Sequence, residues 1–228
     1  MQERSDVTVK MANVTGTAAQ TVSDQLTAVW ENFMKDGEHT AEWYADVMTA
    51  LGAATASSTD EIADGLEKFA AVADTVGLSY EYATAALTTI TAKTRQSADV
   101  VGTALKTLFA RIEGLNLGET LDDGTTLNKY SSALEVVGVN IKNEAGELKS
   151  MDAILDEIGS KWDTIGKDQQ VALAQTVAGV RQYTQFIALM DNWDFMKENL
   201  NTAANATGTL DKQAEIYAES WEAARKRV

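Results

Sequence analysis

His39 is the residue whose type would most readily support catalysis in this chain of 228 residues, because it is the only histidine. A Ser-His-Asp triad would have to use it, and a metal cage of several imidazoles cannot be built from one histidine. His39 stands between Glu38 and Thr40, where we expect a break between two helices. We therefore interpret it as an exposed loop residue.

Carboxylates and thiolates are the next candidates for chemistry. Asp122-Asp123-Gly124, with Glu119 upstream, has the residue types of a calcium loop, but the alternation of oxygen ligands and the closing Glu of such a loop are missing. We interpret it as a turn with helix-capping acids. The 34 Asp and Glu residues single out no pair that could cleave a glycoside, and cysteine is absent.

Arg181 is the one charged residue in a distinctive setting, Gly179-Val180-Arg181-Gln182. We interpret it as a structural arginine that satisfies carbonyl groups at a helix break, with Gly179 at positive φ. The tryptophans have aliphatic neighbours at helical spacing, which indicates core or helix-interface positions rather than ligand stacking; they are Trp30, Trp43, Trp162, Trp193 and Trp221. Glycine-rich phosphate loops are absent. We predict no catalytic, cofactor-binding or metal-binding residue, and no enzymatic activity.

Helices must position these side chains. The chain contains no proline, whereas average usage would give roughly ten. Proline breaks helices and alanine favours them, so an Ala-rich chain without proline is typical of a mainly α protein. The formal net charge of −15 argues against nucleic-acid binding, which needs clustered basic residues. We interpret the one basic cluster, Arg225-Lys226-Arg227, as complementing a helix C-terminus.

Apolar residues at helical spacing and capping residues divide the chain into elements. Residues 1–16 are polar and are expected to be a tail. The predicted helices include Thr17–Lys35, Ala41–Leu51 capped by Thr40, Asp60–Val76, one beginning at Ser79, and Ala98–Ile112. Further helices are expected after Thr125 or Thr126, after Ser150, and after the interruption at Gly166.

A small β-hairpin is predicted near residues 139–149. Val139 and Ile141 alternate with polar residues, the segment 143–146 turns the chain, and Leu148 lies in the return strand. We predict a multi-helix domain with this one hairpin, in three parts. Residues 1–39 form a weakly defined tail and helix, residues 40–193 a helical core domain, and residues 194–228 an amphipathic helix, nicked at Gly208, that continues toward a further region.

The order of parts from Val137 to Trp193, a hairpin followed by helices, resembles the tape measure proteins of long-tailed bacteriophages. The resemblance covers roughly residues 40–221. The motifs that carry it, besides the hairpin, are Gly77-Leu78-Ser79, the helix from Ser97 to Arg111, Lys161-Trp162-Asp163 and Ala178-Gly179-Val180-Arg181-Gln182. No such motif is recognisable in residues 1–39.

The resemblance implies a structural role. Proteins of this family fill the tail tube, set its length, and are released when DNA is ejected. It implies tail tube, tail assembly chaperone and tail-tip proteins as partners, and a location in the virion tail and, during assembly, in the host cytoplasm. Fully helical, 228 residues would span ~340 Å, which leads us to expect a piece of a longer ruler.

Two further expectations concern binding. The C-terminal amphipathic helix makes self-association possible, and its pattern leaves an alternative function open, a helical interaction module or adaptor without catalysis. The longest weakly polar run, Val171–Val180, is half the length of a membrane span, so no membrane segment is predicted.

Overall fold

The computed structural model describes residues 2–35 and 38–225, and within them the chain forms eleven α-helices. The helices are α1 (Gln2–Thr15), α2 (Ala19–Phe33), α3 (Ala41–Ala54), α4 (Thr59–Thr75), α5 (Tyr80–Thr94), α6 (Ala98–Asn116), α7 (Leu127–Val136), α8 (Met151–Lys161), α9 (Lys167–Met190), α10 (Trp193–Ala204) and α11 (Thr209–Arg225), with a 3₁₀ turn at Trp162–Thr164. The mainly α prediction is confirmed.

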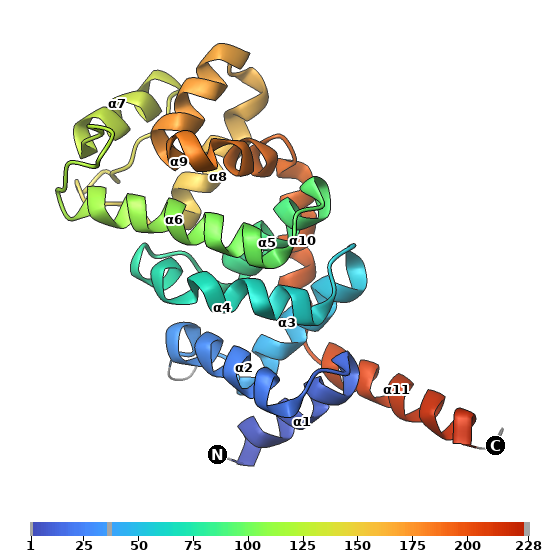
Figure 1. Cartoon of the computed structure of the whole chain (residues 1–228). Coiled ribbons are helices and arrows are strands. Elements are labelled where there is room, and N and C mark those ends of the chain that lie inside the picture. The colour runs from blue at the N-terminus through green and yellow to red at the C-terminus, as the bar shows by residue number, and fades with distance from the viewer. Residues whose placement is uncertain (1, 36–37, 226–228) are drawn as a thin grey trace.

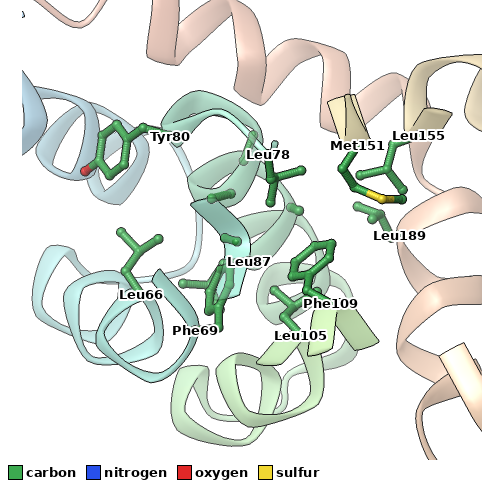
Figure 2. Packing of buried hydrophobic residues seen from close by; sticks show 14 of the residues in the cluster. Leu66, Phe69, Leu78, Tyr80, Leu87, Leu105, Phe109, Met151, Leu155 and Leu189 are labelled. Atoms are coloured by element: carbon green, nitrogen blue, oxygen red, sulfur yellow. The ribbon is translucent and has the colours of Figure 1, made fainter. Parts of the chain in front are cut away.

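The helices stack in successive layers (Figure 1). Helix α4 packs between α2 and α6, while α7, α8 and α9 gather at the far end of the stack. Figure 2 shows the centre, where Leu66 and Phe69 of α4 meet Leu87 of α5 and Phe109 of α6. The Phe69 and Phe109 rings lie 6.0 Å apart. One buried apolar cluster extends from Val7 to Leu210, so the stack shares a common core.

Polar caps explain where most of these helices begin. The side chains of Thr40, Ser79, Ser97 and Ser150 each accept a hydrogen bond from the backbone N–H three residues on. Ser58 and Glu61 complete a capping box at the start of α4. The capping roles predicted for Thr40, Ser79 and Ser150 are therefore confirmed.

The predicted β-hairpin near residues 139–149 is wrong. Residues 139–149 contain no strand and only an isolated antiparallel bridge between Lys142 and Leu148, although the segment does turn back at Gly146. Val139 and Ile141 are both buried, so the alternating pattern arises from packing on the helices rather than from a strand. A two-stranded ribbon this short has too few ladder hydrogen bonds to persist as regular strands.

The N-terminal segment also differs from expectation, because Gln2–Thr15 is helix α1 rather than a tail. Only Val7 and Met11 of this helix are buried. Helix α1 contacts α2, α3 and α11, so it depends on a contact with the far end of the chain. The three-part domain division stays a prediction.

None of the helices within residues 2–35 and 38–225 is both long and apolar enough to cross a bilayer.

Candidate functional site

His39 lies exposed in the loop before α3, as predicted. Its ring stacks on Trp43, with 3.5 Å between the ring centroids and 9° between the planes. Within the described part of the chain, no group of three His, Asp or Glu side chains is placed to hold a metal ion.

Asp123 lies in a turn, as the interpretation of Asp122-Asp123-Gly124 requires. Its carboxylate pairs with the Arg111 guanidinium at 2.7 Å and accepts the backbone N–H of Thr125 at 3.0 Å. Partial burial alone would raise the pKa of Asp123, but the hydrogen bonds from Thr125 and Arg111 outweigh it and lower the pKa. Asp123 thus holds the turn before Thr125 in place and orients the Arg111 side chain.

The structural role predicted for Arg181 belongs instead to Arg111. Arg181 is exposed and has no hydrogen-bond or ion-pair partner among the residues that the structure describes. Arg111 of α6 donates to the carbonyl oxygen of Thr176, at 3.2 Å from Nη2, and to the Thr125 hydroxyl at 3.0 Å. Thr176 lies just before Gly179, the one non-helical residue inside α9.

The break at Gly179 is confirmed, with φ of 75° and ψ of 164°. The sequence motif around it correctly indicated a helix break, but the arginine that the motif contains, Arg181, does not stabilise that break. The motif could not indicate which arginine does, because Arg111 is 65 positions away from Thr176 and reaches it only through the packing of α6 on α9.

Four of the five tryptophans are buried, as predicted: Trp30, Trp43, Trp162 and Trp193. Trp221 is the exception, because 60% of its surface is exposed on α11. Ile216 and Tyr217 of the same helix are 58% and 42% exposed. Helix α11 runs from beside α1 away from the stack (Figure 1). Its outer part therefore exposes three large apolar side chains.

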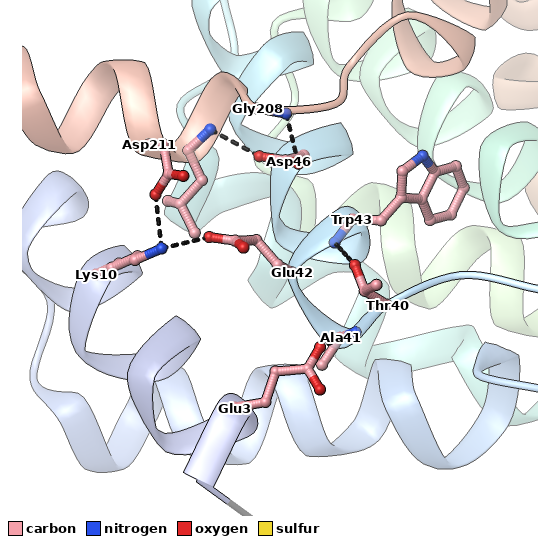
Figure 3. A network of polar contacts seen from close by, with 10 residues as sticks. Glu3, Lys10, Thr40, Ala41, Glu42, Trp43, Asp46, Gly208 and Asp211 are labelled. Atoms are coloured by element: carbon pink, nitrogen blue, oxygen red, sulfur yellow. Dashed lines mark hydrogen bonds and ion pairs between the residues drawn. The ribbon is translucent and has the colours of Figure 1, made fainter.

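The start of α11 is held firmly on the stack (Figure 3). Asp46 of α3, which is only 3% exposed, accepts the backbone N–H of Gly208 and of Leu210, each at 2.8 Å. Burial raises the pKa of Asp46, while the two N–H donors oppose that shift. These are the unpaired donors of a helix N-terminus, so Asp46 caps α11 from another helix.

Lys10 of α1 ties the same corner together. Its ammonium group pairs with Glu42 of α3 at 2.5 Å and with Asp211 of α11 at 2.6 Å (Figure 3). The hydrogen bonds to Asp211 and then to Glu42 raise the pKa of Lys10. All three side chains are partly exposed, so this bridge orients α11 more than it stabilises the fold.

A stripe along α11 has the spacing of a helix-pairing seam. Its residues are Leu210, Ala214, Tyr217 and Trp221, spaced four, three and four apart. Leu210 is buried on the stack, whereas Tyr217 and Trp221 are exposed. The seam of α11, as we name this stripe, thus continues from an internal helix contact onto an open surface. Such a surface can bind another amphipathic helix.

Comparison with known proteins gives one family. The family model described as phage-related minor tail protein matches residues 1–179. This match includes residues 1–39, in which no family motif was expected, and it ends at the α9 break. No solved structure matches the chain.

Proposed function

The chain belongs to the family of phage-related minor tail proteins, and on that premise we propose that it is part of a tape measure protein. In this role it helps to set the tail length and occupies the tube lumen until DNA is ejected. Membership of the family gives a structural role in the virion tail. The tape measure assignment adds to this the resemblance of the motifs around Ser97–Arg111 and Ala178–Gln182.

The charge of the chain supports a place in the DNA path. A net charge of −15 repels the phosphate backbone, so a filler of this kind would not retain the genome as it passes. The proposed role is non-enzymatic, since it requires assembly contacts and no reaction. Tail tube, tail assembly chaperone and tail-tip proteins are its proposed partners, met in the host cytoplasm during assembly.

The experiment that tests lumen occupancy compares virions before and after DNA ejection. Quantitative mass spectrometry of purified tails should find peptides of this chain before ejection and lose them afterwards. A major tube-wall protein, which stays in place, is the internal control. Retention in emptied tails at the original ratio to the wall protein would show a fixed tail component and overturn the proposal.

A ruler role is tested separately by in-frame duplication of the coding segment. Since helix adds 1.5 Å per residue, duplication should lengthen tails by an amount up to ~340 Å. Tail lengths measured by electron microscopy would remain unchanged if the segment is only a terminal module.

The seam of α11 supports one specific contact, with a second copy of this chain. Among its flanking residues, Gln213, Ala218 and Ser220 are uncharged, and Asp211 is paired with Lys10 of the same chain. At 100° per residue, Glu215 and Glu219 lie on the opposite side of the helix. Two copies can therefore pair along the seam without bringing these acids together, despite the high net charge.

Sedimentation velocity over a concentration series tests this pairing. Trp221→Glu should weaken self-association by at least about tenfold, since it places a charge in an apolar contact. Val180→Glu is the matched control, because Val180 is a 68% exposed apolar residue on α9. A wild-type chain that is monomeric throughout, or an equal effect of the two substitutions, would contradict the pairing.

The exposed seam also favours a second candidate, a helical interaction module or adaptor that acts outside the virion. This candidate predicts that purified virions lack the chain, whereas the leading proposal predicts its presence there.

A further inference from the structure

Asp-Gly pairs are a chemically reactive feature of this chain. The backbone nitrogen that follows an aspartate can attack the carboxyl carbon of its side chain, and glycine permits this ring closure best because it has no Cβ atom to obstruct it. Such a pair occurs at residues 36–37, 64–65 and 123–124. Residues 36–37 lie outside the described residues, so the structure separates the other two.

The pair at residues 64–65 is closed to this reaction. It lies inside α4, where Gly65 is buried against Leu87 of α5 and the start of α6. The Gly65 nitrogen belongs to the hydrogen-bond ladder of the helix. The Asp64 carboxylate accepts a hydrogen bond from the Gln25 amide at 2.6 Å. Ring closure at this pair therefore requires α4 to unfold.

The pair Asp123-Gly124, in contrast, lies in a turn that water reaches. Asp123 is exposed and Gly124 is partly exposed. The Gly124 N–H donates to the carbonyl oxygen of Leu121 at 2.7 Å. This hydrogen bond belongs to a single turn on the surface, and such turns open locally at low cost in free energy. The Gly124 nitrogen therefore becomes available while the rest of the fold stays intact.

Arg111 acts on the other reactant, the Asp123 carboxyl group. Its guanidinium lies 2.7 Å from one carboxylate oxygen, and the Thr125 N–H donates to the other oxygen at 3.0 Å. These contacts restrict the side-chain rotation that ring closure requires. Although burial alone would raise it, the hydrogen bonds from Thr125 and Arg111 lower the pKa of Asp123, so less of the protonated acid is present at a given pH. Only the protonated acid readily loses its oxygen as water.

We propose that Asp123-Gly124 is a site of spontaneous isoaspartate formation and that Arg111 sets its rate. The Gly124 nitrogen bonds to the Asp123 Cγ atom, the Cγ–O bond breaks, and the acid hydroxyl leaves with the proton of the nitrogen as one water molecule. Water then adds to the cyclic imide and breaks one of its two C–N bonds. Opening at the backbone carbonyl gives isoaspartate, and opening at Cγ restores aspartate, so the sequence of steps needs no other reactant.

Isoaspartate at this position acts on the break in α9. It adds one methylene group to the backbone and attaches the free carboxylate directly to Cα, which withdraws the carboxylate from Arg111. The same guanidinium donates to the carbonyl oxygen of Thr176 at 3.2 Å, just before Gly179. Without its partner at residue 123, Arg111 holds this carbonyl less firmly. The modification therefore loosens the contact between α6 and α9 as the protein ages.

Incubation of the whole 228-residue chain at mildly acidic pH, below its melting temperature, tests the role of Arg111. Peptide mapping with electron-transfer fragmentation measures isoaspartate at each site, because this method separates it from aspartate of equal mass. Arg111→Met should accelerate its formation at Asp123 at least about fivefold, since the charged hydrogen bonds to the carboxylate are lost. Lys106→Met is the matched control, because it removes an exposed cation from the same helix, and it should leave the rate unchanged. Asp64 should remain aspartate in every folded chain.

A milder variant and an unfolded reference keep the outcome decisive whatever the stability of Arg111→Met. Thr125→Val removes only the hydroxyl that accepts a hydrogen bond from Arg111, and it should accelerate the reaction about twofold. In concentrated urea the wild-type chain should form isoaspartate at Asp64 and Asp123 at comparable rates, because only the fold separates the two pairs.

Hydrogen exchange tests the effect on α9. Wild-type chains that carry isoaspartate, separated from unmodified chains by ion exchange, should exchange faster at residues 176–182. Equal rates at Asp123 in the wild type, Arg111→Met and Thr125→Val would overturn the control by Arg111. A rate that is no higher for Asp123 than for Asp64 in the folded variants would overturn the assignment of the site. Unchanged exchange at residues 176–182 would overturn the coupling to the α9 break.

Discussion

Gly102 of α6 lies against Gly65 of α4 so closely that a Cβ atom on Gly102 would be 2.4 Å from the Gly65 carbonyl oxygen. Real Cβ atoms do not approach an oxygen to this distance. The two glycines therefore allow the backbones of α4 and α6 to touch at the centre of the stack, where Phe69 and Phe109 also meet. This contact positions the remaining layers on either side.

Gly102→Ala should consequently destabilise the protein. The clash is with backbone, which cannot rotate away, so overpacking should cost about 1–3 kcal/mol even after the better helix propensity of alanine. Thermal melting followed by circular dichroism should show a fall of ~2–4 °C per kcal/mol.

Gly114→Ala in the same helix is the matched control. Its Cβ would lie 2.7 Å from a carboxylate oxygen of Glu119, which is exposed and can swing aside. Equal melting temperatures of the two variants would refute the importance of the α4–α6 contact.

Gly179→Leu or Gly179→Ala should also be destabilising, for a different reason. A Cβ would meet the Arg111 guanidinium at an ordinary distance of 3.5 Å, so space is available. The cost arises from φ of 75° with ψ of 164°, a region essentially restricted to glycine, and should be about 1–3 kcal/mol. Urea denaturation measures it, with exposed Val180→Ala as a control expected within ~0.5 kcal/mol. An unchanged midpoint for both Gly179 variants would contradict the strain.

The Arg111–Asp123 pair predicts a pH dependence. The pKa of folded Asp123 lies below 3.8, the ordinary value, so its contribution is complete above that value and is lost as pH falls through the folded pKa. Asp123→Asn should therefore lower stability by about 1 kcal/mol at neutral pH and by progressively less below pH 3.8. Urea denaturation from pH 7 to pH 3 measures this difference.

Asp122→Asn is the control for this series, because Asp122 is exposed and unpaired within the described residues. A gap between wild type and Asp123→Asn that grows on acidification would have the wrong sign for this pair.

Local features were predictable from the sequence. Helix starts follow from single residues such as Ser79 and Ser150, whose side chains bond to N–H groups three positions away. The break at Gly179 is local too. Helix α1 was missed because it has only two buried residues, and its partners α3 and α11 are remote in the chain.

Features that depend on packing were not predictable in the same way. Arg181 is closer to the break in sequence than Arg111, and only the α6–α9 contact decides which of the two bonds to Thr176. Alternation at Val139 and Ile141 indicates burial equally well in a strand or in a loop that lies on helices. The interpretation of Arg225-Lys226-Arg227 as complementing a helix C-terminus stays a prediction, because Lys226 and Arg227 lie outside the described residues.

The sequence analysis did not consider Asp46, although it is the only charged residue between Trp43 and Leu51 and a lone carboxylate in an apolar helix indicates a buried, hydrogen-bonded group. Both of its carboxylate oxygens accept hydrogen bonds from N–H groups at the start of α11.

Asp46→Asn keeps one acceptor and turns an NH₂ group toward the other N–H, so the anchoring of α11 should weaken by about 1–2 kcal/mol. Hydrogen exchange should then accelerate across Thr209–Arg225 while α4 and α6 stay protected. Lys10→Met removes only the exposed ion pairs and should change that exchange much less. Because the seam of α11 needs an ordered helix, Asp46→Asn should also weaken self-association, and unaltered exchange in α11 would show that Asp46 does not anchor it.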